Sequence, residues 1–164
     1  MFNNDLMKAA AELLEHCRGR SIRLATAESC TGGLLGGLLT EAAGASDVID
    51  CGFIVYSDQA KTELLDVSSE LLERHGAVSS ETAIAMAEGA LARCPDAQIA
   101  LSITGVAGPG GGSPDKPVGL VHFALAQNGT RSEAEHEIFS GDRHSVRQSS
   151  LKKALSMMQA AVLR

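Results

Sequence analysis

A serine stands in a glycine-rich segment whose pattern could support nucleophilic chemistry. Ser29 lies within TAESCTGG, residues 26–33, between a short predicted strand and a predicted helix. A helix that begins there leaves backbone N–H groups without intrahelical partners, and such groups can stabilise an anion or a developing oxyanion. We therefore interpret Ser29 as a candidate nucleophile. The oxyanion and substrate site would come from the next four residues: Cys30, Thr31, Gly32 and Gly33.

The same segment also allows a structural interpretation, in which Ser29 or Thr31 only caps the following helix. It is not the G-x-S-x-G elbow of many hydrolases, because Ala27 stands where the first glycine should be. It is not a Walker A loop either, since no Gly-Lys-Ser or Gly-Lys-Thr follows. The segment alone leaves both interpretations open.

A serine nucleophile needs a proton acceptor, and the five histidines are poor candidates because none has an obvious carboxylate partner. A lysine can serve if burial or a nearby cation lowers its pKa. Lys61 follows the predicted strand 51–56, which ends at Tyr56. Since strand ends of an α/β sheet converge on one crevice, Ser29, Tyr56, Lys61 and Thr104 are expected to meet there. A solvated lysine and a tyrosine at the rim of the core are the alternatives.

The loop 105–119, GVAGPGGGSPDKPVG, is unusually rich in glycine. Gly105 and Gly108 would let the backbone approach a ligand, and we assign both to the substrate site. A dinucleotide fingerprint does not fit, because the glycine order is G-x-x-G-x-G and prolines follow where a helix should begin. A flexible surface loop is the alternative, and Lys116 is either a ligand contact or solvated.

Two arginines, Arg143 and Arg147, lie four residues apart on one face of the last predicted helix. Arg143, in the first turn, could bind a phosphate group. A salt bridge with Asp142 or Asp115 is an equally reasonable interpretation.

The elements that must position these residues alternate between strand and helix and end with a hairpin around residues 128–129. This order predicts an α/β fold, a three-layer α/β/α sandwich with a mixed, mainly parallel central sheet. No linker divides the chain, so we expect one domain over 1–164. Helices are expected over 5–17 and 33–41, from near 61, from 68 to 76, from 79 or 80, and from 142 onward; strands are expected over 22–26, 51–56, 97–105, 119–127 and 132–140.

Composition narrows the classes of function. A net charge of −6 argues against non-specific nucleic-acid binding. The amphipathic start does not read as a signal peptide, and no apolar run is long enough to cross a membrane, so we expect a cytoplasmic protein. The four cysteines form no C-x-x-C pair and are expected to be reduced, mostly buried thiols without a metal. Small residues on two helices are compatible with a homo-oligomer.

Several ordered motifs together resemble one known family across nearly the whole chain. They are TAESCTGG, the strand end VYS followed by AK, GAVS at 76–79, SITGVAGPGGGSPDKPVG and FSGDR. The chain resembles the C-terminal domain of the competence/damage-inducible CinA proteins, and in particular the stand-alone nicotinamide-nucleotide amidohydrolases of that family. The larger CinA proteins carry a further N-terminal nucleotide-hydrolysing domain, which has no counterpart in this sequence.

The resemblance implies hydrolysis of the carboxamide of nicotinamide mononucleotide to nicotinate mononucleotide and ammonia, with no metal or cofactor. It implies Ser29 as the nucleophile, with Lys61 and Tyr56 activating it and moving the proton. Thr104, Gly105 and the glycine loop would line the nucleotide site. Two other hypotheses remain open: a regulatory module that binds a nucleotide in the same crevice without hydrolysing it, and a hydrolase of a different small amide.

Overall fold

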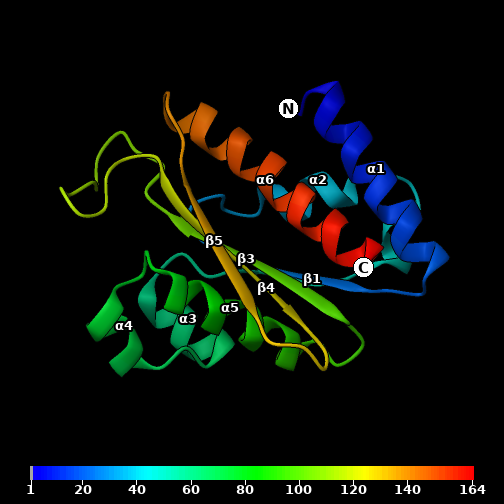
Figure 1. The fold of residues 1–164 in the computed structure, drawn as a ribbon, viewed down its shortest axis with the longest axis horizontal. Coiled ribbons are helices and arrows are strands. Elements are labelled where there is room, and N and C mark those ends of the chain that lie inside the picture. The colour runs from blue at the N-terminus through cyan, green and yellow to red at the C-terminus, as the bar shows by residue number, and fades with distance from the viewer. Residues whose placement is uncertain (1) are drawn as a thin grey trace.

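A computed structural model describes residues 2–164 of the chain (Figure 1). The helices are α1 (Asn4–Gly19), α2 (Leu34–Thr40), α3 (Asp58–Leu65), α4 (Ser69–His75), α5 (Ser80–Arg93) and α6 (Arg143–Leu163). The strands are β1 (Leu24–Glu28), β2 (Ile49–Ile54), β3 (Ile99–Gly105), β4 (Leu120–Gln127) and β5 (Glu133–Ile138). A short 3-10 helix, Ala45–Asp47, precedes β2.

Within the described residues, the strands form one five-stranded sheet in the order β2-β1-β3-β4-β5. β1 pairs in parallel with both β2 and β3, whereas β4 and β5 join antiparallel. Glu28, the last residue of β1, pairs with Ile54 of β2 and Ile103 of β3. The carboxyl ends of the three parallel strands therefore meet at one edge of the sheet, as expected for this class of fold.

Helices cover both faces of the sheet and confirm the three-layer sandwich. α1, α2 and α6 pack on one face, and α3, α4 and α5 on the other (Figure 1). The core under the first group includes Leu13, Leu35, Phe123 and Met158. The core under the second group is separate and is built from small and medium side chains such as Ala25 and Met86.

Side-chain caps explain where most helices begin. Ser68, Ser79 and Asp142 accept backbone N–H bonds from residues three positions later, so α4, α5 and α6 begin where the sequence predicts. The prediction for α3 was late, because Ser57 accepts the N–H of Ala60 and starts the helix at Asp58. Lys61 consequently lies at the end of the first helical turn and not at the helix start.

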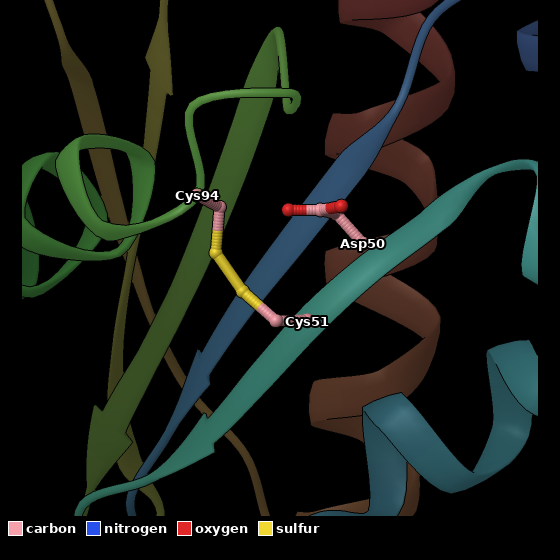
Figure 2. A group of neighbouring side chains, drawn as sticks. All are labelled: Asp50, Cys51 and Cys94. Carbon is pink, nitrogen blue, oxygen red and sulfur yellow. A yellow bond between two sulfur atoms is a disulfide. The ribbon is translucent and has the colours of Figure 1, made fainter.

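The expectation that all four cysteines are reduced is wrong for one pair. A disulfide joins Cys51 of β2 to Cys94, which follows α5 (Figure 2). The two positions are 43 residues apart in sequence and meet only because β2 and α5 lie in adjacent layers, so no local motif marks them. Cys17 and Cys30 are free and buried, as predicted.

Membrane insertion was not expected from the sequence. Among residues 2–164, no helix combines the length and the apolar character needed to cross a bilayer.

A glycine contact between α5 and α3 gives a direct test of this packing. A Cβ placed on Gly89 would collide with the backbone carbonyl of Leu65, which is rigid, so Gly89→Ala should lower the free energy of unfolding by about 1–3 kcal/mol. Urea unfolding followed by circular dichroism measures this. Gly19→Ala is the matched control, because a Cβ there meets nothing within 4 Å. Equal stability of the two variants would contradict the packing described here.

Candidate active site

Ser29 follows β1 directly and is held by its backbone on both sides. Its N–H donates to the carbonyl of Ile103 on β3 at 2.9 Å, and its own carbonyl accepts the N–H of Gly32 at 3.0 Å. The residue is 9% exposed. Ser29 is therefore fixed at the edge where the three parallel strands end, as the sequence predicts for a residue of the crevice.

Glu28, immediately before Ser29, is a buried residue that the sequence analysis missed. Its Oε2 accepts the N–H groups of Gly33 at 3.1 Å and Leu35 at 3.0 Å, and its Oε1 accepts the N–H of Gly36 at 2.8 Å. The carboxylate thus occupies the N-terminus of α2, where negative charge is favourable. An acidic residue shortly before a glycine-rich helix start was the available signal.

The contacts of Glu28 reduce the set of N–H groups that could face a substrate. Gly33 donates to Glu28 and Gly32 donates to Ser29. Along residues 2–164, neither the N–H of Cys30 nor that of Thr31 finds a backbone or side-chain oxygen acceptor. Of the four N–H groups predicted to be unpaired, two are therefore occupied, and a role of the other two in stabilising an oxyanion stays a prediction.

Gly32 and Gly33 are required by the turn itself. Their φ angles are +59° and +92°, in the left-handed region that favours glycine. A Cβ on Gly33 would also lie 2.7 Å from Cδ1 of Ile54 on β2. Both glycines thus allow β1 to enter α2 within a few residues and close to the neighbouring strand, without any ligand.

The side chains of Cys30 and Thr31 are buried and face the protein interior. Burial raises the pKa of the Cys30 thiol to about 12, with a smaller contribution from the negative charge of Glu28. Cys30 is therefore an unreactive thiol at neutral pH. The Thr31 hydroxyl is fully buried and has no partner within the described residues, while its carbonyl accepts a bond from Arg147 at 2.8 Å. The side chains of these two residues are therefore withdrawn from a substrate, and contact through their backbone N–H groups stays a prediction.

Lys61 is buried, which excludes the alternative of a solvated lysine. It is 1% exposed, and its Nζ lies 3.4 Å from the carbonyl oxygens of Tyr56 and Ser57 and 3.6 Å from Oδ1 of Asp58. Burial lowers the pKa of Lys61, and Asp58 partly opposes this shift. A desolvated amine of this kind can act as a base.

Tyr56, Arg143 and Gly108 are brought together from three distant segments. Nη2 of Arg143 donates to the Tyr56 hydroxyl at 2.9 Å, and Nη1 donates to the Gly108 carbonyl at 2.8 Å. The guanidinium thus links the end of β2 to the glycine loop, instead of pairing with Asp142 or Asp115. Tyr56 is 60% exposed, so its ring lies at the surface of this edge.

Thr104 and Gly105, at the end of β3, have packing roles in the structure. The Thr104 side chain is buried and its hydroxyl donates to the Ala77 carbonyl at 2.7 Å. A Cβ on Gly105 would lie 2.6 Å from the carbonyl oxygen of Leu120, so glycine is needed for close pairing with β4. Their assignment to the substrate site stays a prediction.

The glycine loop is anchored on both sides of its tip. Lys116 donates to the His75 carbonyl at 2.6 Å and so caps the C-terminus of α4, which is neither of the roles the sequence suggested. On the other side, Arg143 binds Gly108. At Gly110, between these anchors, a Cβ would meet nothing within 4 Å, so the tip is open to solvent.

No histidine within residues 2–164 is hydrogen-bonded to Ser29, Tyr56 or Lys61. His122 contacts the Ser80 hydroxyl at 3.1 Å, and burial lowers its pKa. Among the same residues, Lys61 is not hydrogen-bonded to Ser29 either, so the choice of a lysine as the base stays a prediction.

The sequence and the fold of the chain are similar to those of known proteins. The family model described as the CinA C-terminal domain matches residues 6–162. A crystal structure of the competence/damage inducible protein CihA from Agrobacterium tumefaciens superposes with a TM-score of 0.96 at 41% identity, covering 100% of this chain and 99% of that one.

Two curated relatives illustrate the range of the family. The nicotinamide-nucleotide amidohydrolase PncC of Escherichia coli K12 is 40% identical over 158 residues, which is 96% of this chain and 95% of that protein. A CinA-like protein of Syntrophobacter fumaroxidans is 51% identical over 144 residues, but these make up only 34% of its length. The chain thus spans about a third of several longer relatives it matches. Taken with the matched fold, these similarities show that the chain belongs to the CinA C-terminal domain family.

Proposed function

We propose that this chain hydrolyses the carboxamide of nicotinamide mononucleotide, giving nicotinate mononucleotide and ammonia. The observation that carries the proposal is Ser29, fixed where the parallel strands end and followed by the N–H groups of Cys30 and Thr31, together with Lys61, a buried lysine whose pKa burial lowers. The similarity to the E. coli amidohydrolase along almost the full length of both chains supports the choice of substrate.

In the proposed mechanism, neutral Lys61 accepts the proton of the Ser29 hydroxyl as the oxygen attacks the amide carbon. The N–H groups of Cys30 and Thr31 stabilise the oxyanion that forms. The proton passes to the leaving nitrogen, with the Tyr56 hydroxyl as a relay, and ammonia departs. Water then attacks the acyl-enzyme, gives up a proton to the same base and releases the carboxylate and Ser29.

Arg143 is proposed to bind the phosphate group of the nucleotide. Its guanidinium stands at the N-terminus of α6 and already donates two hydrogen bonds to neutral oxygens. A phosphate is a stronger acceptor than either, and bidentate binding suits a guanidinium. Cys30, Thr31, Gly32, Gly33, Thr104, Gly105 and Gly108 complete the proposed substrate site. A cytoplasmic location and a homo-oligomeric state also remain proposals.

One observation favours the alternative of a module that binds a nucleotide without hydrolysing it. Asp58 and two carbonyl oxygens contact Nζ of Lys61, and all three stabilise its charged form, which cannot act as a base. In that case the crevice would hold the nucleotide and Lys61 would serve only as a structural cation.

The two functions are separated by measuring ammonia. Purified protein mixed with nicotinamide mononucleotide should release ammonia, and Ser29→Ala should reduce the rate on the order of 10³-fold or more, because the nucleophile is lost. Nicotinamide and glutamine serve as comparison substrates and report on a different small amide. Thermal stabilisation by the nucleotide without ammonia release, in folded wild-type protein, would support the binding module instead.

The role of Lys61 predicts a pH dependence. Since the neutral amine is the base, kcat/KM should rise with pH and level off above the pKa of Lys61, which burial places below its ordinary value of 10.5. Lys61→Gln should remove this dependence along with most of the activity. Lys116→Gln, which changes a lysine that caps α4, should keep the wild-type profile. A Lys61→Gln enzyme with the wild-type pH profile would refute the assignment.

Glu28 is predicted to be a positioning residue that shapes the oxyanion site without touching the substrate. Glu28→Gln loses the charge that accepts three N–H bonds, so the turn relaxes and kcat should fall about 10–100-fold with a small change in KM. Steady-state kinetics on variants that are folded by circular dichroism measure this. The control is Ser102→Ala on the adjacent strand β3. It removes the buried 2.6 Å hydrogen bond from the Ser102 hydroxyl to the Ala83 carbonyl, and it should lower stability but leave kcat unchanged. Equal loss of kcat in both variants would show a merely structural role.

A further inference from the structure

The disulfide between Cys51 and Cys94 involves none of the proposed catalytic residues. Two of those residues lie between the cysteines in the sequence. The disulfide joins the first half of β2 to Cys94, the residue that follows α5, and the two cysteines are 43 positions apart in sequence (Figure 2). Tyr56 and Lys61 are within the segment between them, whereas Ser29 is outside it. The bond therefore closes a loop of chain that contains the proposed base and proton relay.

A β-bulge shapes the surroundings of the two sulfurs. Leu24 pairs with Ile49 and Ala25 pairs with Cys51, so Asp50 is the extra residue in β2. A bulge breaks the usual alternation of side chains, and a carboxylate oxygen of Asp50 lies within 4.8 Å of both sulfur atoms (Figure 2). The same carboxylate pairs with Arg23 at 3.0 Å, which holds it in place.

The two sulfurs differ in access to solvent. Cys94 is 1% exposed, whereas Cys51 is half-buried and lies on β2, the edge strand of the sheet, which pairs with β1 alone among the described strands. Cys51 is therefore the more accessible of the two residues to a small reagent from solvent.

We propose that Cys51 and Cys94 form a reversible thiol–disulfide site that exchanges with low-molecular-weight thiols through Cys51. A thiolate of the small thiol attacks the Cys51 sulfur, the bond to Cys94 breaks, and Cys94 leaves as a thiolate that takes up a proton. A second small thiol then attacks the mixed disulfide and releases Cys51. The protein disulfide gains two electrons, and two small thiols become one small disulfide.

Reduction opens the closed segment and removes a covalent restraint from the chain that carries Tyr56 and Lys61. The ladder between β1 and β2 remains, so the fold persists, but the residue that follows α5 is no longer cross-linked to the edge strand. The oxidised protein is consequently the more stable and more active form. The statement about activity rests on the proposed hydrolysis, whereas the exchange reaction does not.

The exchange is tested by equilibrating the full chain with reduced and oxidised glutathione in graded ratios. The free thiols are then alkylated, and the mass of the protein is measured by mass spectrometry. Two additional cysteines should become alkylated as the ratio shifts toward reduced glutathione, and Cys17→Ser should leave that transition unchanged. Cys94→Ser should retain one glutathione on Cys51, while Cys51→Ser should retain none on Cys94. A pair that stays bonded, or stays alkylated, at every ratio overturns the proposal. So does zinc bound stoichiometrically by reduced wild type and lost in Cys51→Ser, because the pair would then be a metal site with Asp50.

The consequence is tested by comparing the two redox forms of wild type. Reduction should lower the melting temperature by about 5–10 °C and kcat/KM for nicotinamide mononucleotide several-fold. Cys51→Ser should behave as the reduced form under both conditions. Equal activity in the two forms overturns the coupling to the site. Ammonia release absent from both forms, with the thiol transition intact, refutes the proposed hydrolysis and not the exchange site.

Discussion

Three N–H groups converge on the carboxylate of Glu28, and the geometry of the site follows from this contact. The carboxylate supplies acceptors for the first turn of α2 and places its charge where the helix dipole favours it. Because these donors are taken, the N-terminus of α2 is not a free anion site, unlike many helices that follow a strand. Within the part of the chain that the structure describes, the N–H groups of Cys30 and Thr31, next to Ser29, have no backbone or side-chain oxygen acceptor. A buried structural contact thus determines which N–H groups the proposed oxyanion site can use.

α6 connects the turn after Ser29 to the other segments at the carboxyl ends of the parallel strands. Arg147 donates to the Thr31 carbonyl in the turn, and Arg143, one helical turn earlier, reaches both Tyr56 and Gly108. The last helix of the chain therefore makes hydrogen bonds to three separate segments: the turn after β1, the residues that follow β2, and the glycine loop. Lys61 approaches from the opposite layer, in α3, so both helical layers of the sandwich contribute to the same edge.

Local chemistry explains which features the sequence predicts well. Ser68, Ser79 and Asp142 cap helices through contacts three residues away, and the strand ends follow from the topology of an α/β sheet. The burial of Lys61 and the disulfide depend on layers that meet only in the folded chain, and no pattern of neighbours records them. Thr104, Gly105 and Lys116 show a different limit, since residues with chemical potential also satisfy backbone groups or close packing. The sequence shows which residues could bind a ligand, but it does not show whether they bind one or instead satisfy packing and backbone hydrogen bonds.

The two hydrogen bonds of Arg143 carry a thermodynamic consequence for any anion that binds it. A phosphate that takes the N–H groups now bonded to the Tyr56 hydroxyl and the Gly108 carbonyl displaces both, so part of its binding free energy is used to break those contacts. Binding of a phosphate to Arg143 is then linked to the release of Tyr56 and of the glycine loop at Gly108. A substrate lacking the phosphate would leave both restrained, and the edge would thereby distinguish a nucleotide from its free base through a change in mobility as well as through direct contact.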